Sequence, residues 1–135
     1  MDLDEIKALK VPACDDAALF LWTPSPMLPG ALEVMNGWGF DYRTSMVWVK
    51  DKIGMGWWVR QRHELLLIGR RGAMHTPDAE DEPESVIEAP RTGHSEKPPV
   101  VYEIIERMYP LATRVELFAR QRRDGWAAWG NQLPQ

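Results

Sequence analysis

The sequence predicts an α/β fold, and three observations support that prediction. A continuous apolar run at residues 17–22 is typical of a strand buried on both faces, and residues 63–69 form another largely apolar run that indicates a strand. Segments with helical patterning follow each run, at residues 28–38 and 98–109, with a glycine ending the first and a proline starting the second. Strands and helices therefore alternate along the chain, which favours a largely parallel sheet covered by helices.

The other elements follow from local signals. Residues 2–9 have apolar side chains at helical spacing, and Pro12 ends this short helix. Residues 40–49 and 113–118 are rich in β-branched and aromatic residues, which indicates two further strands. Residues 72–97 are predicted to form a long loop with a short extended piece at 85–89. Loops of this length are uncommon in compact domains and are usually functional.

Composition points to one globular domain over residues 1–135. The chain is 44% hydrophobic and 27% charged, which excludes wholesale disorder. Its only cysteine, Cys14, excludes an intrachain disulfide framework and a cysteine-rich zinc site, so we expect no metal and a cytoplasmic location. Residues 1–12 lack a long apolar run, so neither a signal peptide nor a membrane span is expected there.

Three segments could carry chemistry. The first, residues 48–64, combines Trp57 and Trp58 with arginines, a pattern suited to stacking on an unpaired or flipped base. The alternative is a loop whose tryptophans pack on the core. The second, residues 91–99, precedes a helix, where Lys97 could bind an anion. Alternatively, this segment only caps the helix.

The third segment, residues 116–133, ends a predicted strand and continues into an arginine-rich turn. Arg120 leaves the strand end, and Asn131 and Gln132 supply amides suited to hydroxyls and purine edges. The alternative is a polar tail. The chain has no Gly-x-Gly-x-x-Gly motif, no P-loop, no nucleophile elbow and no His/Cys metal cluster, so those chemistries are excluded.

These segments together resemble one family nearly end to end. The blocks are LFLWTPSP, SMVWVK, GMGWWVRQRHELLLIG, HSEKPP, ELFAR and GWAAWGNQL. They are similar to the adenine N(6)-methyltransferases typified by the catalytic subunit of the mRNA N(6)-adenosine methyltransferase. The resemblance implies a Rossmann-like fold, S-adenosyl-L-methionine as cofactor, and the N(6) amine of adenine in DNA or RNA as methyl acceptor.

The resemblance also implies roles for individual residues. Lys97 and Arg120 would contact the cofactor, and Asn131 and Gln132 would bind its ribose or adenine part. The loop that shapes the substrate-adenine pocket corresponds to a second set of residues: Lys50, Trp58, Arg60 and Glu64. One departure follows Arg120, because family members often have His-Asn where this chain has Arg122-Arg123.

A second departure concerns catalysis. The family's signature, Asp-Pro-Pro-Trp at the end of a preceding strand, does not occur in residues 1–135. We therefore expect an N-terminally truncated domain with no catalytic residue of its own and an exposed sheet edge open to homo-oligomer formation. Two interpretations stay open: an adenine N(6)-methyltransferase, active or inactive in this form, and a non-catalytic nucleic-acid-binding or scaffold subunit of the same fold.

Overall fold

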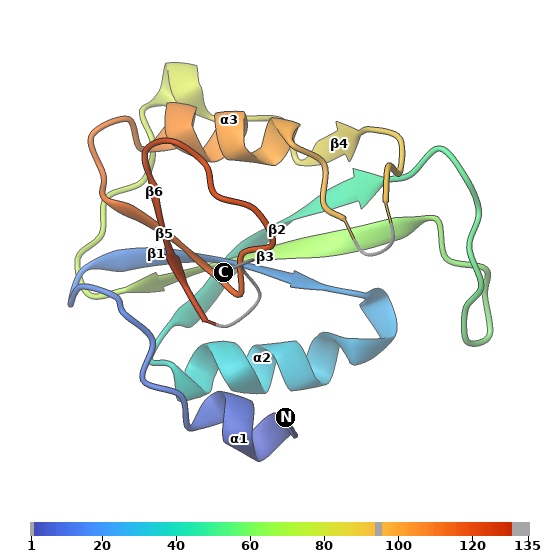
Figure 1. Cartoon of the computed structure of the whole chain (residues 1–135), viewed down its shortest axis with the longest axis horizontal. Helices are drawn as coiled ribbons and strands as arrows, with labels where there is room; N and C mark the ends of the chain where they lie inside the picture. The colour runs from blue at the N-terminus through green and yellow to red at the C-terminus, as the bar shows by residue number, and fades with distance from the viewer. Residues whose placement is uncertain (1, 94–95, 131–135) are drawn as a thin grey trace.

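A computed structural model describes residues 2–93 and 96–130 (Figure 1). The helices and strands, with two short 3-10 turns η1 and η2, follow in this order: α1 (Leu3–Lys7), β1 (Ala17–Thr23), η1 (Ser25–Met27), α2 (Leu28–Gly37), β2 (Asp41–Val49), β3 (His63–Arg71), η2 (Ala79–Asp81), β4 (Val86–Glu88), α3 (Val100–Met108), β5 (Arg114–Leu117) and β6 (Trp126–Trp129). The mixed α/β content is as the sequence predicts.

The main sheet has four strands in the order β1-β3-β2-β4, and β5 pairs with β6 in a separate two-stranded sheet. β3 runs antiparallel to both β1 and β2, whereas β4 is parallel to β2 and β6 is parallel to β5. The prediction of a largely parallel sheet is therefore wrong for the main sheet. Apolar runs reveal that a strand is buried on both faces but not which way it runs.

Helices cover both faces of the main sheet, which explains the unbroken apolar strands. In Figure 1, α2 lies below the sheet and α3 above it. Successive residues of β3 belong to different clusters, because their side chains point to opposite faces of the sheet. Leu67 joins the α2-side cluster and Leu66 the α3-side cluster, and each is 1% exposed.

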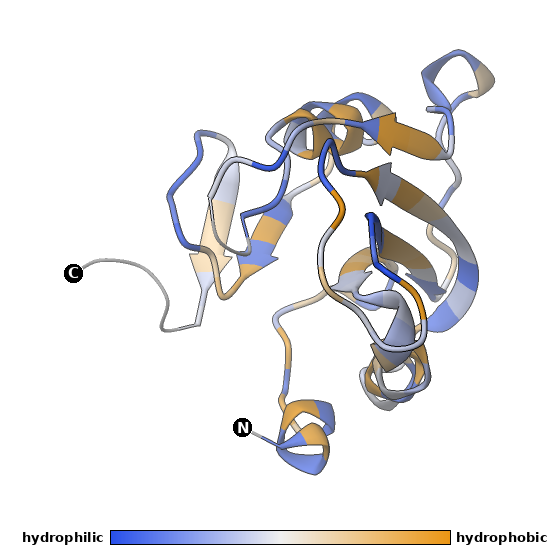
Figure 2. Cartoon of the chain, turned by 90° about the vertical axis from the view of Figure 1, so that its right-hand side faces the viewer, coloured by the Kyte–Doolittle hydropathy of each residue, from blue (hydrophilic) through white to orange (hydrophobic). Residues whose placement is uncertain are grey.

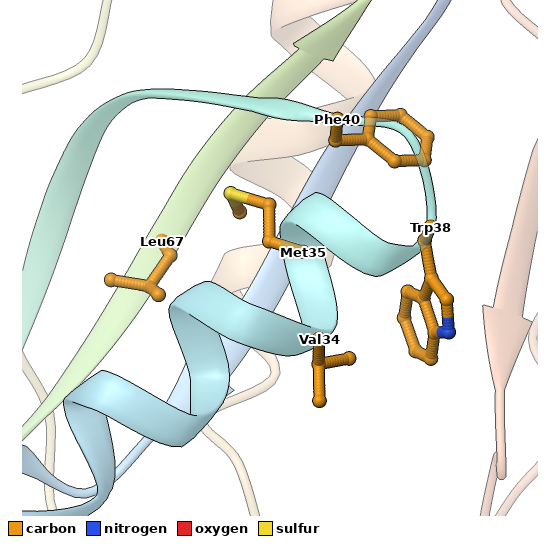
Figure 3. Close-up of a cluster of buried hydrophobic side chains, with 5 residues drawn as sticks. All are labelled: Val34, Met35, Trp38, Phe40 and Leu67. Atoms are coloured by element: carbon orange, nitrogen blue, oxygen red, sulfur yellow. The ribbon is translucent and has the colours of Figure 1, made fainter. Parts of the chain in front are cut away.

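The α2-side cluster is drawn in Figure 3. Its buried members are Val34, Met35, Trp38, Phe40 and Leu67. The indole of Trp38 also donates a hydrogen bond to the carbonyl of Ile6, at 2.8 Å, and so ties α1 to α2.

The buried members of the α3-side cluster are Met46, Trp48, Leu66, Ile87 and Val101. Side chains from β2, β3, β4 and α3 therefore meet in it, so this cluster fixes the short strand β4 and the start of α3 against the sheet.

Strand direction determines where polar groups gather. β1, β2 and β4 run the same way, so their carboxyl ends share one edge of the sheet, and the antiparallel β3 brings its amino end to that edge. Thr23 ends β1, Lys50 follows β2 and Glu64 lies near the start of β3. The fold therefore places these three side chains at one edge, although they come from different strands.

Candidate active site

The shared edge carries a polar pocket of about 440 Å³. Its lining comes from the end of β2, the start of β3 and the segment before α3, and consists of Trp48, Lys50, Lys52, Glu64, Arg91, Thr92, Gly93, Glu96 and Lys97. A volume of this size is ordinary for a small-molecule site. Both charge signs are present, so the pocket suits a ligand that also carries both.

The central feature of the pocket is an ion pair. Lys97 Nζ donates to Glu64 Oε2 at 2.6 Å, and Glu64 is 9% exposed as a residue. A buried carboxylate requires such a partner, because desolvation without compensation is costly. The two residues lie far apart in the sequence, and the resemblance assigns them to opposite sides of the site, cofactor and substrate. The structure brings them into direct contact.

Aromatic rings lie beside two of the three lysines that line the pocket, Lys50 and Lys97. Lys97 Nζ lies 5.4 Å from the ring centroid of Trp22, and Lys50 Nζ lies 4.9 Å from that of Trp48. The two indoles meet edge to face at 5.9 Å, and Trp48 Nε1 donates to the carbonyl of Ala89 at 2.8 Å. These rings hold the ammonium groups by cation–π attraction and keep the apolar wall of the pocket rigid.

Two loops close the pocket and are joined to each other. The backbone N–H of Arg91 donates to Asp51 Oδ1 at 2.9 Å. This hydrogen bond lowers the pKa of the Asp51 carboxyl below its ordinary value. Thr92 Oγ1 donates to Glu96 Oε2 at 2.8 Å within the second loop. The loop after β2 and the segment before α3 are therefore fixed relative to each other at the pocket mouth.

The structure separates the residues that the sequence singled out. Lys50, Glu64 and Lys97 line the pocket. Trp58 and Arg60 lie exposed on the loop between β2 and β3, outside that lining.

The remaining assignments fall near the C-terminus. Arg120 is exposed just beyond β5, outside the pocket lining, and takes part in an interaction there. Asn131 and Gln132 lie outside the described residues.

Sequence reasoning missed two tryptophans, Trp48, which lines the pocket, and Trp22, which lies beside Lys97, because both sit inside strands and look like core residues. The signal was the position of Trp48, two residues before Lys50, which puts both side chains on the same face of the strand.

A second polar network joins the C-terminal strand pair to α3. Glu106 accepts hydrogen bonds from Arg123 Nε at 2.8 Å and from Trp126 Nε1 at 2.7 Å. These donors, Arg123 first, hold the pKa of the Glu106 carboxyl at about 2, against an ordinary value of 4.5. The guanidinium of Arg123, one of the two residues at which the resemblance led us to expect a departure from the family pattern, is bound to Glu106.

In the same network Tyr102 donates to Glu116 Oε1 at 2.7 Å. Burial, and then this bond, raise the pKa of its phenol.

The segment after β5 contains a strained residue. Phe118 has a φ of +56°, a left-handed conformation that bulky residues rarely adopt. Its backbone N–H donates to the carbonyl of Trp129 at 2.6 Å, and the two rings meet edge to face. Such outliers cluster at functional sites, where the surroundings hold them in place. Here the strain sets the direction in which the chain leaves β5 toward Arg120.

One group of acidic side chains, Asp78, Glu80 and Asp81, comes close enough to contact a cation. Arg107 Nε already donates to Asp81 at 3.1 Å, and the cluster is largely exposed. Ca²⁺ takes roughly 6–8 oxygen ligands, so three largely exposed carboxylates, one of them already paired with Arg107, do not form a Ca²⁺ site.

In the described parts of the chain, no helix is both long and apolar enough to cross a bilayer.

The structure by itself defines a class of protein: a mixed α/β domain with a polar pocket at the carboxyl ends of its strands, where a carboxylate–lysine pair lies beside tryptophan rings. Comparison with known proteins narrows this class. Residues 1–132 match the MT-A70 family, and the chain belongs to that family. This confirms the resemblance drawn from the sequence.

Several relatives are similar over almost the whole chain. Type II methyltransferase M.MunI of Mycoplasma sp. is 34% identical over 99% of this chain. The human N(6)-adenosine-methyltransferase catalytic subunit METTL3 and the Arabidopsis thaliana N(6)-adenosine-methyltransferase MT-A70-like are each 32% identical over 96%. This chain spans 59% of the Mycoplasma protein, 24% of the human one and 20% of the plant one.

Proposed function

We propose that this chain forms the cofactor- and base-binding part of a methyltransferase that uses S-adenosyl-L-methionine and acts on the N(6) amine of adenine in DNA or RNA. The observation that carries the proposal is the Glu64–Lys97 pair beside Trp22 and Trp48, in a chain of the MT-A70 family. The names of its relatives, N(6)-adenosine-methyltransferases among them, support the same reaction.

The groups around the pocket fit the cofactor. S-adenosyl-L-methionine carries a carboxylate, an ammonium and a sulfonium, so its site needs groups of both signs. Lys50, Lys97 and Arg91 offer cations, and Glu64 and Glu96 offer carboxylates. When bound, the cofactor supplies an electrophilic methyl group. The residues of the chain would orient the ligands and exclude water, with Lys97 and Arg120 on the cofactor and Lys50 and Glu64 on the base.

The remaining assigned residues complete this proposal. Asn131 and Gln132 would bind the ribose or adenine part of the cofactor, and Trp58 and Arg60 would meet the nucleic acid outside the pocket. A Rossmann-like arrangement of one domain over residues 1–135 is part of the same proposal, as is a cytoplasmic location, which the single exposed thiol of Cys14 supports.

Isothermal titration calorimetry with S-adenosyl-L-methionine tests the cofactor assignment. We expect saturable binding that Arg120→Ala, Asn131→Ala and Lys97→Met each weaken about tenfold or more, since each removes a charge-assisted or amide contact. Arg43→Gln, on the exposed start of β2, is the matched control and should bind normally. The absence of binding by the unaltered chain would contradict the assignment.

A non-catalytic nucleic-acid-binding or scaffold role is the second candidate, and the exposed indoles of Trp57 and Trp58 on an arginine-bearing loop favour it. Transfer of radiolabelled methyl groups to adenine-containing DNA and RNA oligonucleotides separates the two. Methylation by this chain alone would exclude the scaffold role. Nucleic-acid binding without cofactor binding would establish it.

We also propose that β1 forms the contact between copies of the chain. β1 is an edge strand of the main sheet, and none of residues 17–22 is fully buried although all six are apolar. An apolar edge with unpaired backbone groups is a template for pairing with another strand. Light scattering coupled to size exclusion should detect a concentration-dependent dimer. A monomer at all concentrations would contradict this proposal.

A further inference from the structure

The loop between β2 and β3, residues 50–62, carries the most exposed aromatic side chains among the described residues. Trp58 is 91% exposed, Trp57 73% and Met55 95%. In Figure 1 this loop extends beyond the end of β2, away from the body of the molecule. The two indoles therefore do not pack on the core, which was the alternative that the sequence left open.

The loop nevertheless has a defined conformation that is held by backbone hydrogen bonds. Two backbone hydrogen bonds extend the β2–β3 hairpin toward its tip, from the N–H of Lys50 to Arg62 at 2.8 Å and from the N–H of Gly54 to Gln61 at 2.7 Å.

At the tip, the N–H of Val59 donates to the carbonyl of Trp57 at 2.7 Å around Trp58, whose φ is +68°. This is the pattern of the rare, strained γ-turn. A Cβ at Gly56 would overlap the carbonyl oxygen of Val59, so only glycine allows this tip.

Charge on the loop is opposite to that of the whole chain. The loop has four basic residues, Lys50, Lys52, Arg60 and Arg62, and one acidic residue, Asp51, whereas the whole chain has a net charge of −4. Figure 2 views the molecule from the side on which the loop projects, and hydrophilic and hydrophobic stretches alternate along it. Two adjacent exposed indoles with cations before and after them in the loop match the chemistry of single-stranded nucleic acid, which offers phosphates and accessible base faces.

The loop begins at the pocket mouth. Lys50 and Lys52 line the pocket, and Asp51 between them accepts the hydrogen bond from the backbone N–H of Arg91, which also lines the pocket. A nucleic acid whose adenine entered the pocket would therefore leave it along the base of this loop and reach the two indoles. The faces of stacked bases are covered within a duplex, so only unpaired nucleotides present them to a tryptophan.

We propose that Trp57 and Trp58 stack on unpaired nucleotides that flank the target adenine, with Arg60 and Arg62 on their phosphates, so that the chain prefers single-stranded nucleic acid. This inference rests on the proposed function for the position of the adenine. The stacking step itself can be measured without cofactor or catalysis.

Fluorescence anisotropy with a labelled single-stranded oligonucleotide of mixed sequence tests this inference, with the same sequence as a duplex in parallel. We expect tighter binding of the single strand, quenching of tryptophan emission, and at least about tenfold weaker binding by the Trp57→Ala/Trp58→Gly variant. Glycine is chosen at 58 because it accepts the positive φ, so the turn survives the loss of the ring. Leu111→Ala, which trims another exposed apolar side chain, should bind as the unaltered chain does.

Three results would overturn the inference: no oligonucleotide binding by the unaltered chain, equal affinity for single strand and duplex, or a loop variant that binds normally but changes oligomeric state. The last result would assign the loop to a protein contact. Calorimetry with S-adenosyl-L-methionine on the loop variant keeps the two proposals separate. If the loop variant binds the cofactor normally but no longer binds the oligonucleotide, the proposed function and the stacking inference are both supported. If the unaltered chain does not bind the cofactor, only the proposed function is contradicted.

Discussion

Glu64 and Lys97 illustrate what single residues contribute to this molecule. The Glu64 residue is 9% exposed, the ammonium of Lys97 lies 2.6 Å from its carboxylate, and the Trp22 indole lies beside that ammonium. The sequence identified both residues as ligand-binding candidates. It could not identify their contact, because 33 positions separate them and only the antiparallel course of β3 brings them together.

Lys97→Met tests this pair. We expect the free energy of unfolding to fall by about 1–3 kcal/mol, less than for a fully buried pair because the Lys97 side chain is 33% exposed. Adding Glu64→Gln should recover much of the loss, because the uncompensated carboxylate is then gone. Urea denaturation measures both effects. Lys52→Met, on the same pocket, serves as control, and an equal loss in this variant would contradict the assignment.

At the level of elements, most strands and helices could be predicted from the sequence. The runs at 17–22 and 63–69 became β1 and β3, and the expected helices at 28–38 and 98–109 became α2 and α3. Local patterns sufficed because side-chain spacing reports burial directly. β6 was missed, since the WAAW segment has no alternation and owes its strand geometry to pairing with β5.

Glu106 links two of these elements, and the pH dependence of the link can be predicted. Its pKa is depressed to about 2, so its stabilising contribution is complete above the ordinary value of 4.5 and is lost as the pH falls toward 2. We expect Glu106→Gln to lose this dependence, so that its melting temperature falls less than that of the unaltered chain as the solution is acidified. Thermal melts across this range measure the difference.

Glu33→Gln, on the exposed face of α2, is the control for that experiment and should keep the dependence of the unaltered chain. Parallel curves for the unaltered chain and Glu106→Gln would show that Arg123 and Trp126 do not stabilise the ionised form of this carboxyl.

For the whole molecule, the two apolar clusters lie on opposite faces of one sheet and meet through its strands. Leu66 and Leu67 are neighbours in the sequence and belong to different clusters. We expect Leu66→Ala and Leu67→Ala each to cost about 2–5 kcal/mol. The two clusters share strands and should therefore unfold together. In each variant, the denaturation midpoint followed by far-ultraviolet circular dichroism should equal the midpoint followed by tryptophan fluorescence. Transitions that separate would mean that the two faces unfold independently.

The shared strand β3 also needs a feature that selects its correct register against β1 and β2. Sliding β3 by one position would exchange Leu65 and Leu67 for Leu66 and Ile68, and these side chains are almost equal in volume and hydrophobicity. Other residues must therefore disfavour the slipped register.

Gly69 supplies part of it, since a Cβ there would lie 2.7 Å from the sulfur of Met35 on α2, and that buried side chain would have to move. Glu64 and Arg71 supply the rest, through Lys97 at one end of β3 and the carbonyls of Ala13 and Cys14 at the other. The aliphatic residues of β3 stabilise the strand, while Gly69, Glu64 and Arg71 select a single register for it. Exchanges among the leucines should therefore be tolerated over evolution far more readily than changes at these three positions.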